Sequence, residues 1–291
     1  MEATIDAVVT TAVRITPGFV RVGLAVRDDG AWSSLGVPDE FVHIEVGAQT
    51  PDADGHAARH YTVSAVVPGG FEVEVALHGQ GPGAAWGETV AVGDAVCVST
   101  PKGYYAAPDT HVPRVLVGDA TALPAIARIL AEASAEESFR VTVELASMAD
   151  LRDLTTVAQA DIEWRIGGNG VAPSTMVDAA TREVAEAVEG RGVDGSGAGH
   201  GWEQDPAVYA WVACESAVSR RVRTHLRRGL GLPARAVRIV GYWHSDAHRM
   251  RSVWEGLTQV QRDTYSAMWR EDRSDEENWE ELEPFLRTLG V

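Results

Sequence analysis

The chain of 291 residues changes its pattern at Pro113, and this change constrains the fold more than any other feature. Before it, short valine-rich runs are separated by glycine, proline and aspartate, and several alternate apolar with polar residues, as half-buried antiparallel strands do. The runs are GFVRVGLAV, FVHIEV, RHYTVSAVV, FEVEVALH and DAVCVS. About six such strands without a convincing helix predict a small closed antiparallel barrel of the Greek-key type.

After Pro113, strand-like and helix-like segments alternate. The strands are RVLVGD, FRVTVELA, DIEW, AVYAWVAC and VRIVGYW, and the helices are TALPAIARILAEAS, TREVAEAVEG and AVSRRVRTHLRR. Such alternation predicts a parallel sheet with helices on both faces. Thr121 is expected to cap the first helix, and Pro124 is tolerated in its first turn. The six glycines of GRGVDGSGAGHG indicate a flexible surface loop.

These patterns predict a two-domain β and α/β chain with an appendage. We expect a barrel domain over 1–110, an α/β domain over 111–250 and an acidic helical tail over 251–291. The tail contains Trp254, Trp269 and Trp279, which we expect to anchor it to the body of the protein. We also expect the tail to pack over the α/β domain and to narrow access to the ligand that the barrel holds.

Composition excludes several classes of protein. The net charge of −17 argues against nucleic acid or an anionic membrane as partner. No apolar run is long enough to span a membrane, and the first residues do not resemble a signal peptide. Cys97 and Cys214 cannot form a disulfide framework, so a reducing cytoplasm is the expected location.

Positions 216 to 245 hold seven arginines and no acid. One interpretation is a solvated helix, because Val218, Val222 and Leu226 form an apolar stripe and the arginines lie beside it. The other is a positive patch for an anionic ligand. The sequence leaves these two interpretations equally open.

Three short motifs could hold a ligand. In RHYTVS, Arg59 and Tyr61 share one face of a strand and offer a phosphate-binding fork and a flat ring. HGQGPGAAW offers a close backbone approach to an anion, and GDATALP lies at a strand-to-helix junction, where phosphates bind. Each motif alone is weak evidence, and each has an ordinary structural explanation. No metal-binding constellation is evident.

In order along residues 10–250, these segments resemble the siderophore-interacting protein family of flavin-dependent ferric-siderophore reductases, which is related to ferredoxin reductases. RHYTVS is similar to its Arg-x-Tyr-Thr flavin motif, and LHGQGPGAAW to its His-Gly-x-Gly-Pro-Ala-x-x-Trp segment. GDATALPAI, WVACES and VGYWHSD are similar to three further motifs of the second domain. The acidic tail resembles the appendage of one subgroup.

The resemblance implies an oxidoreductase in which FAD carries the chemistry, with no catalytic side chain and no metal site. Its expected substrate is a ferric siderophore, and its expected donor is NAD(P)H or reduced ferredoxin. The implied cofactor-binding residues are Arg59, Tyr61, Thr62, Val63, His78, Gly81, Pro82, Gly83, Ala84, Trp86, Thr121, Ala122 and Trp243. The implied substrate-binding residues are Lys102, Arg220, Arg221 and Arg223.

The chain also departs from the family pattern. Ser64 and Thr100 replace an arginine and a glycine in the barrel, and His244 and Ser245 replace basic residues after Trp243. Cys214 replaces a glycine, and we expect its side chain to project toward the nicotinamide space. Because basic residues that could bind a 2′-phosphate are also missing after Trp243, we expect NADPH to be a poor donor, with NADH or a ferredoxin preferred. Two other functions stay open: a siderophore-binding protein without activity, and a general flavin reductase.

Overall fold

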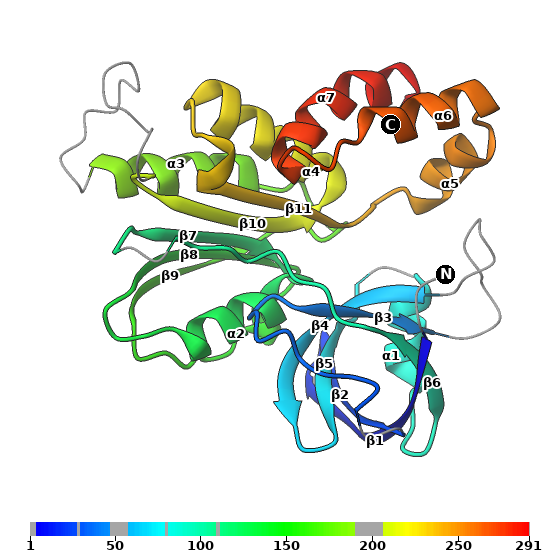
Figure 1. Cartoon of the computed structure of the whole chain (residues 1–291). Coiled ribbons are helices and arrows are strands. Elements are labelled where there is room, and N and C mark those ends of the chain that lie inside the picture. The colour runs from blue at the N-terminus through cyan, green and yellow to red at the C-terminus, as the bar shows by residue number, and fades with distance from the viewer. Residues whose placement is uncertain are drawn as a thin grey trace.

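The N-terminal part of the chain folds into a closed antiparallel barrel in the computed structural model (Figure 1). The structure describes residues 4–27, 30–46, 58–78, 81–108, 111–189 and 206–290, so the glycine-rich segment 190–201 lies outside the described residues. Around the barrel the strands follow the order β1-β2-β5-β4-β3-β6, a Greek-key arrangement that confirms the predicted fold. Their bounds are β1 (Thr4–Thr16), β2 (Phe19–Val26), β3 (Phe41–Glu45), β4 (Ala58–Val67), β5 (Gly70–Ala76) and β6 (Ala95–Ser99).

One helix interrupts the barrel segment, contrary to the expectation of strands alone. Helix α1 (Pro82–Thr89) begins with a proline, whose fixed φ suits the first helical turn. It packs closely on β5, because a Cβ added to Gly87 would lie 2.8 Å from the Val75 side chain. The glycines that suggested a turn therefore allow a helix to approach a strand.

The second part of the chain is an all-parallel sheet in the order β11-β10-β7-β8-β9, as predicted. Helix α2 lies on one face and helices α3 and α4 lie on the other (Figure 1). The strands are β7 (Arg114–Asp119), β8 (Ser138–Leu145), β9 (Gln159–Ile166), β10 (Tyr209–Glu215) and β11 (Val237–Trp243). The helices are α2 (Leu123–Glu132), α3 (Met176–Glu189) and α4 (Ser216–Arg223), with short turns η1 (Met148–Asp150), η2 (Thr224–Gly229) and η3 (Ala234–Ala236).

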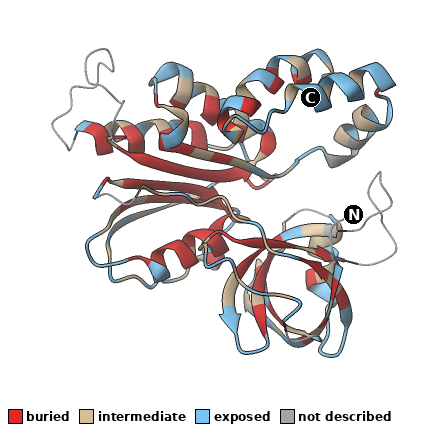
Figure 2. Ribbon diagram, viewed as in Figure 1, coloured by how far each residue is buried: buried red, intermediate tan, exposed pale blue. Residues whose placement is uncertain are grey.

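The core of the sheet lies along β7 and β10, which are buried along nearly their whole length (Figure 2). Val115 and Val117 pack under α3 and α4, and Leu116 packs under α2. The cap of α2 differs from the prediction. Ala122 is the N-cap residue, and the Thr121 hydroxyl instead donates a hydrogen bond of 2.6 Å to Asp119.

Three helices form the tail, α5 (Ala247–Glu255), α6 (Gln259–Met268) and α7 (Asp275–Thr288). Helix α7 packs along β11 and α4 (Figure 1) and buries Leu282 and Leu286, so the tail covers the α/β part as expected. The prediction for the tryptophans holds in part. Trp254 packs on Tyr265 and Trp269 packs on Trp279, within the tail itself, but the guanidinium of Arg223 on α4 lies over the Trp279 ring at 5.7 Å, so Trp279 also contacts the body.

Buried carboxylates join the barrel to the sheet. Asp39, directly before β3, accepts a hydrogen bond of 3.0 Å from the Trp211 indole of β10. Asp150 accepts hydrogen bonds from the Thr16 hydroxyl and the Gly18 amide of the barrel. Among the residues that the structure describes, no helix is long and apolar enough to cross a membrane.

Candidate cofactor site

Strand β4 carries the first predicted motif, with Tyr61 turned inward. Tyr61 is 8% exposed, and its ring lies 5.4 Å from the ring of Trp86 on α1, centroid to centroid. Its hydroxyl is buried without a hydrogen-bond partner. Burial raises the pKa of Tyr61 well above its usual value, although the charge of nearby Arg59 acts in the opposite direction. Arg59 and Tyr61 therefore share one region of the barrel, as the spacing predicts.

The N-terminus of α1 faces the same region. Gly81 is its N-cap residue in extended conformation, and no side chain caps the helix. A Cβ added to Gly83 would lie 2.9 Å from the Tyr61 hydroxyl, so only glycine permits this approach. Uncapped backbone N–H groups at a helix N-terminus bind anions, especially phosphates. The residues before it, Gly79 and Gln80, lie outside the described part of the chain.

Asp119, at the carboxyl end of β7, gathers donors from several strand ends. Its Oδ1 accepts from the Thr121 amide at 2.9 Å and from the Thr121 hydroxyl. Its Oδ2 accepts from the Glu215 amide at 3.1 Å and from the Trp243 indole at 2.7 Å. Burial raises the pKa of Asp119, even though these hydrogen bonds oppose the rise. Asp119 thus ties the ends of β7, β10 and β11 together.

Trp243 connects this edge of the sheet to the barrel. Its indole ring lies 4.7 Å from the imidazole of His78, which follows β5. Burial lowers the pKa of His78 below 6.5 despite the opposing charge of Asp119, so the ring is neutral at neutral pH. Two residues predicted from distant motifs are therefore in contact, at the place where both parts of the molecule meet.

The loop after β9, which the sequence analysis does not single out, holds a buried Asn169 and passes beside Trp243. Asn169 adopts a positive φ of 53°, its amide oxygen accepts from the Ala120 amide, and its amide nitrogen donates to the Glu144 carbonyl. A Cβ added to the neighbouring Gly170 would lie 3.9 Å from the Trp243 ring. The glycines flanking Asn169 were the available signal, since positive φ favours Gly and Asn.

The residues present fit a phosphate-bearing ring ligand such as FAD. A guanidinium, an uncapped helix N-terminus and an unpartnered buried hydroxyl lie together at Arg59, Gly81–Ala84 and Tyr61. Two predicted contacts need correction. Val63 and Ala122 are fully buried, Val63 in the barrel interior and Ala122 beneath the strand-to-helix junction, so neither offers a surface to a ligand. Thr62 is also largely buried, beside Tyr242.

Three of the seven arginines at positions 216–245 bind helix α7, namely Arg223, Arg227 and Arg238. Arg223, expected to bind substrate, is 3% exposed and pairs with Glu276 at 2.7 Å and with Glu283 at 3.4 Å. Arg227 pairs with Glu280, and Arg238 pairs with Asp275. The prediction for Arg223 is therefore wrong, because acids that lie far along the sequence neutralise it. The apolar stripe of Val218, Val222 and Leu226 is confirmed.

The other predicted substrate residues lie on two separate elements. Lys102 is exposed on the loop after β6, where its backbone bridges to Phe41. Arg221 is exposed and Arg220 half-buried on α4, and the charge of Arg220 helps burial to lower the pKa of His244.

Cys214 does not project toward the sheet edge. It is fully buried among the side chains between the sheet and helices α3 and α4. Burial raises the pKa of its thiol well above the usual value. The expectation that it obstructs a nicotinamide is therefore wrong, because its side chain belongs to the core.

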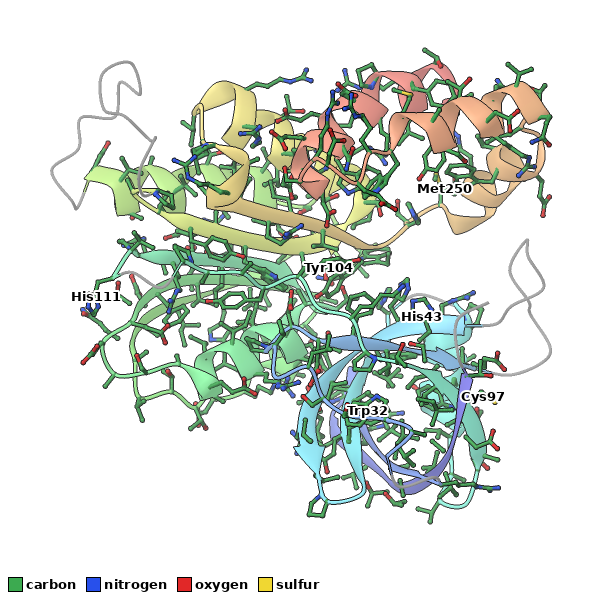
Figure 3. The ribbon with its side chains drawn as sticks, in the orientation of Figure 1. Trp32, His43, Cys97, Tyr104, His111 and Met250 are labelled. Atoms are coloured by element: carbon green, nitrogen blue, oxygen red, sulfur yellow. The ribbon has the colours of Figure 1, made fainter. Side chains whose placement is uncertain are left out.

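An aromatic cluster on the outer face of the barrel was not predicted. The rings of His43 and His60 lie 4.0 Å apart, and Phe41 lies 5.4 Å from Tyr104. Figure 3 shows Tyr104 where the barrel meets the sheet, and Arg238 of β11 lies over its ring at 5.6 Å. The alternation of FVHIEV predicts that Phe41 and His43 share a face, but the ring partners come from other segments.

Comparisons with known structures find the same architecture. The chain is 26% identical to a siderophore utilization protein from T. fusca, covering 83% of this chain and 93% of that chain with a TM-score of 0.63. The siderophore-interacting protein from Acinetobacter baumannii is 18% identical, and the match covers 91% of this chain and 96% of that chain with a TM-score of 0.62. The ferredoxin-NADP+ reductase of Plasmodium falciparum shares the fold at 9% identity, with coverage of 82% and 96% and a TM-score of 0.57.

Family comparisons agree with this. No curated protein matches the chain. Residues 34–105 match the siderophore-interacting FAD-binding domain, and residues 113–246 match the siderophore-interacting protein domain that follows it. These two matches cover the barrel strands around Tyr61 and the whole parallel sheet, so the chain belongs to the siderophore-interacting protein family, whose fold is that of the ferredoxin reductases.

Proposed function

We propose that this protein is a flavin-dependent reductase that converts Fe(III) in a ferric siderophore to Fe(II), with electrons from NAD(P)H or ferredoxin through FAD. The observation that carries the proposal is the convergence of Arg59, the Tyr61 hydroxyl and the open N-terminus of α1 in a domain of the FAD-binding type. Bound FAD would supply electron transfer in single steps, for which Fe(III) needs no catalytic side chain. Gain of one electron would convert Fe(III) to Fe(II) and release the iron, because the hard oxygen ligands of a siderophore bind Fe(II) more weakly than Fe(III).

The chain's own residues would hold and shield the cofactor. Arg59 and the amides of α1 would bind phosphate, and the Tyr61 hydroxyl would donate a hydrogen bond to an acceptor on the ligand. The pair of His78 and Trp243 would close the space between the barrel and the sheet and exclude water. Lys102, Arg220 and Arg221 remain our proposed contacts for an anionic siderophore.

We propose that each of the three parts expected from the sequence has its own function. Residues 1–110 would hold FAD, 111–250 would receive the donor, and 251–291 would support the second unit. Because Cys214 is buried, it gives no reason to disfavour NADPH. His244 and Ser245, which stand where basic residues would bind a 2′-phosphate, still favour NADH or a ferredoxin over NADPH as the donor. We place the protein in the cytoplasm.

Two measurements test the proposal on the purified protein. The first is the visible absorption spectrum after titration with FAD, and the second is anaerobic stopped-flow bleaching of that spectrum by each donor. We expect reoxidation on mixing with a ferric siderophore, together with Fe(II) captured by a ferrous chelator. Bleaching without such reoxidation would indicate a general flavin reductase, and siderophore binding without any flavin spectrum would indicate a binding protein.

Arg59→Ala tests the assignment of the site. Removing a charge-assisted phosphate contact should raise the Kd for FAD at least tenfold, since such contacts contribute about 1.5–3 kcal/mol. Arg21→Ala is the matched control, because Arg21 lies on β2, which is separated from β4 by β5 in the barrel, and pairs with Glu74. Full FAD affinity in Arg59→Ala would disprove the assignment.

A further inference from the structure

Strand β4 is irregular directly after Tyr61 and Thr62. Val63 pairs with Val73 of β5, but the next pair joins Ala65 to Glu72, so Ser64 is an extra residue that forms a bulge. A bulge leaves backbone groups outside the ladder, and buried backbone groups need partners elsewhere.

Arg128 of α2 reaches from the second domain to this bulge. Its Nη1 donates a hydrogen bond of 2.8 Å to the Val63 carbonyl and another of 2.8 Å to Oε1 of Glu40. The Val63 amide in turn donates at 2.8 Å to the backbone carbonyl of Glu40. Arg128, Val63 and Glu40 therefore form a closed ring of hydrogen bonds at the start of the bulge.

The members of this ring have little freedom. Glu40 is fully buried, and its carboxylate also accepts from the Ser34 hydroxyl and the Leu35 amide. Arg128 is 6% exposed, and its Nε donates at 2.6 Å to Glu132 one helical turn further on. Charge-assisted hydrogen bonds of this kind are strong and directional, and breaking one partner leaves a buried charge unpaired.

We propose that Arg128 is a positioning residue, which through the Val63 carbonyl fixes where Tyr61 and Thr62 stand in the cofactor site. The inference rests on the proposed role of β4 in binding FAD. Arg128 belongs to the α/β domain, whereas the cofactor-binding motif on β4 belongs to the barrel. The α/β domain would therefore help to fix the geometry of a site in the barrel. Because α2 begins at Leu123, just after the carboxyl end of β7, the same helix connects the sheet edge to the cofactor strand.

The test variant is Arg128→Met/Glu40→Gln. It removes both hydrogen bonds of Nη1 and avoids an unpaired buried carboxylate, while the Glu40 backbone carbonyl stays available to Val63. The matched control is Arg152→Met, which breaks a different pair between the two parts, since Arg152 binds Glu74 of β5 at 2.5 Å.

Two readouts separate positioning from a general loss of stability. Hydrogen exchange of a peptide covering 59–67 in the cofactor-free protein reports on the strand itself. The Kd for FAD, with the visible circular dichroism of the bound flavin, reports on the site. We expect the double variant to exchange about tenfold faster over 59–67 and to bind FAD about tenfold more weakly, the equivalent of one hydrogen bond.

Arg152→Met should leave both quantities at the wild-type value. Wild-type exchange and wild-type FAD affinity in the double variant would overturn the inference, as would equal changes in the control. If the wild type binds no FAD, the proposed function fails, and the exchange measurement still decides whether Arg128 orders the strand.

Discussion

The hydroxyl of Tyr61 has opposite effects with and without a ligand. In the cofactor-free protein it is buried and unpartnered, which costs free energy of folding. Tyr61→Phe should therefore stabilise the cofactor-free protein by about 1 kcal/mol and raise the Kd for FAD several-fold. Urea unfolding and FAD titration measure the two effects. A variant with unchanged FAD affinity would show that the hydroxyl does not meet the ligand.

The neutral imidazole of His78 makes stability depend on pH. Because the folded protein lowers the pKa of His78 below 6.5, the unfolded chain binds a proton more readily there. Stability should therefore fall as the pH drops below about 6.5, and His78→Gln should lessen that fall. Urea unfolding of the cofactor-free protein at about pH 7 and about pH 5.5 provides the comparison. An identical fall in the variant would contradict this account.

Some residue-scale features could be predicted from the sequence and others could not. Arg59 and Tyr61 were predictable, because spacing on a strand fixes which side chains share a face. The side on which Cys214 lies was not, because β10 is a central strand buried on both faces and its apolar run shows no alternation. The partner of Arg128 was also hidden, since no local pattern connects it to Glu40.

At the scale of elements, α7 is held on the body by buried ion pairs. Glu276 and Arg223 are both almost fully buried, and Glu276 also accepts a hydrogen bond of 2.6 Å from the Ile239 amide. Glu276→Ala should therefore lower the free energy of unfolding by about 3 kcal/mol, because it removes the nearer partner of the buried Arg223, leaving Glu283 at 3.4 Å, and also removes the acceptor of the Ile239 amide. Chemical denaturation is the measurement.

Asp272→Ala is the control for this prediction, because its pair with Arg270 is exposed on the same tail. Exposed pairs contribute little to stability, so this variant should unfold like the wild type. An equal decrease in the free energy of unfolding in both variants would show that the buried Glu276 pair stabilises the protein no more than the exposed pair does.

The order of strands and helices was largely predictable, and the exceptions have physical reasons. Glycine-rich segments predict turns, yet α1 uses its glycines for close packing on β5 and for access to its N-terminus. The tail was predicted as helical, but its attachment was not. Tryptophans suggest apolar anchors, whereas ion pairs between acids of α7 and arginines distant in sequence hold it on α4, η2 and β11, and Trp279 contacts α4 through the charged Arg223.

For the whole molecule, the paired arginines limit how strongly an anionic substrate is attracted. With Arg223, Arg227 and Arg238 bound to α7, the attraction would depend on Lys102, Arg220 and Arg221 against a net charge of −17. Association with an anionic ferric siderophore should slow modestly as salt rises to about 0.2 M. In Arg220→Ala/Arg221→Ala the sign should reverse, because the repulsion by the net negative charge then outweighs the attraction by Lys102, and salt screens mainly that repulsion.

Stopped-flow association rates at several salt concentrations test this expectation. Arg270→Ala on the exposed tail is the control and should keep the wild-type slope. The same slope in the double variant would mean that Arg220 and Arg221 do not face the substrate.

The hydrogen bonds of Ile239 affect whether the sheet edge at β11 can pair with a strand of another molecule. β11 is the last strand on its side of the sheet, and VRIVGYW carries few charges to discourage a further strand. The strand at the opposite edge, β9, carries Asp161, Glu163 and Arg165, and these charges disfavour pairing with a further strand. On β11 the Ile239 amide donates to Glu276, and the Ile239 carbonyl accepts from Arg223 at 2.5 Å. The acidic helix therefore acts as a cover that keeps an open sheet from extending into a neighbouring molecule.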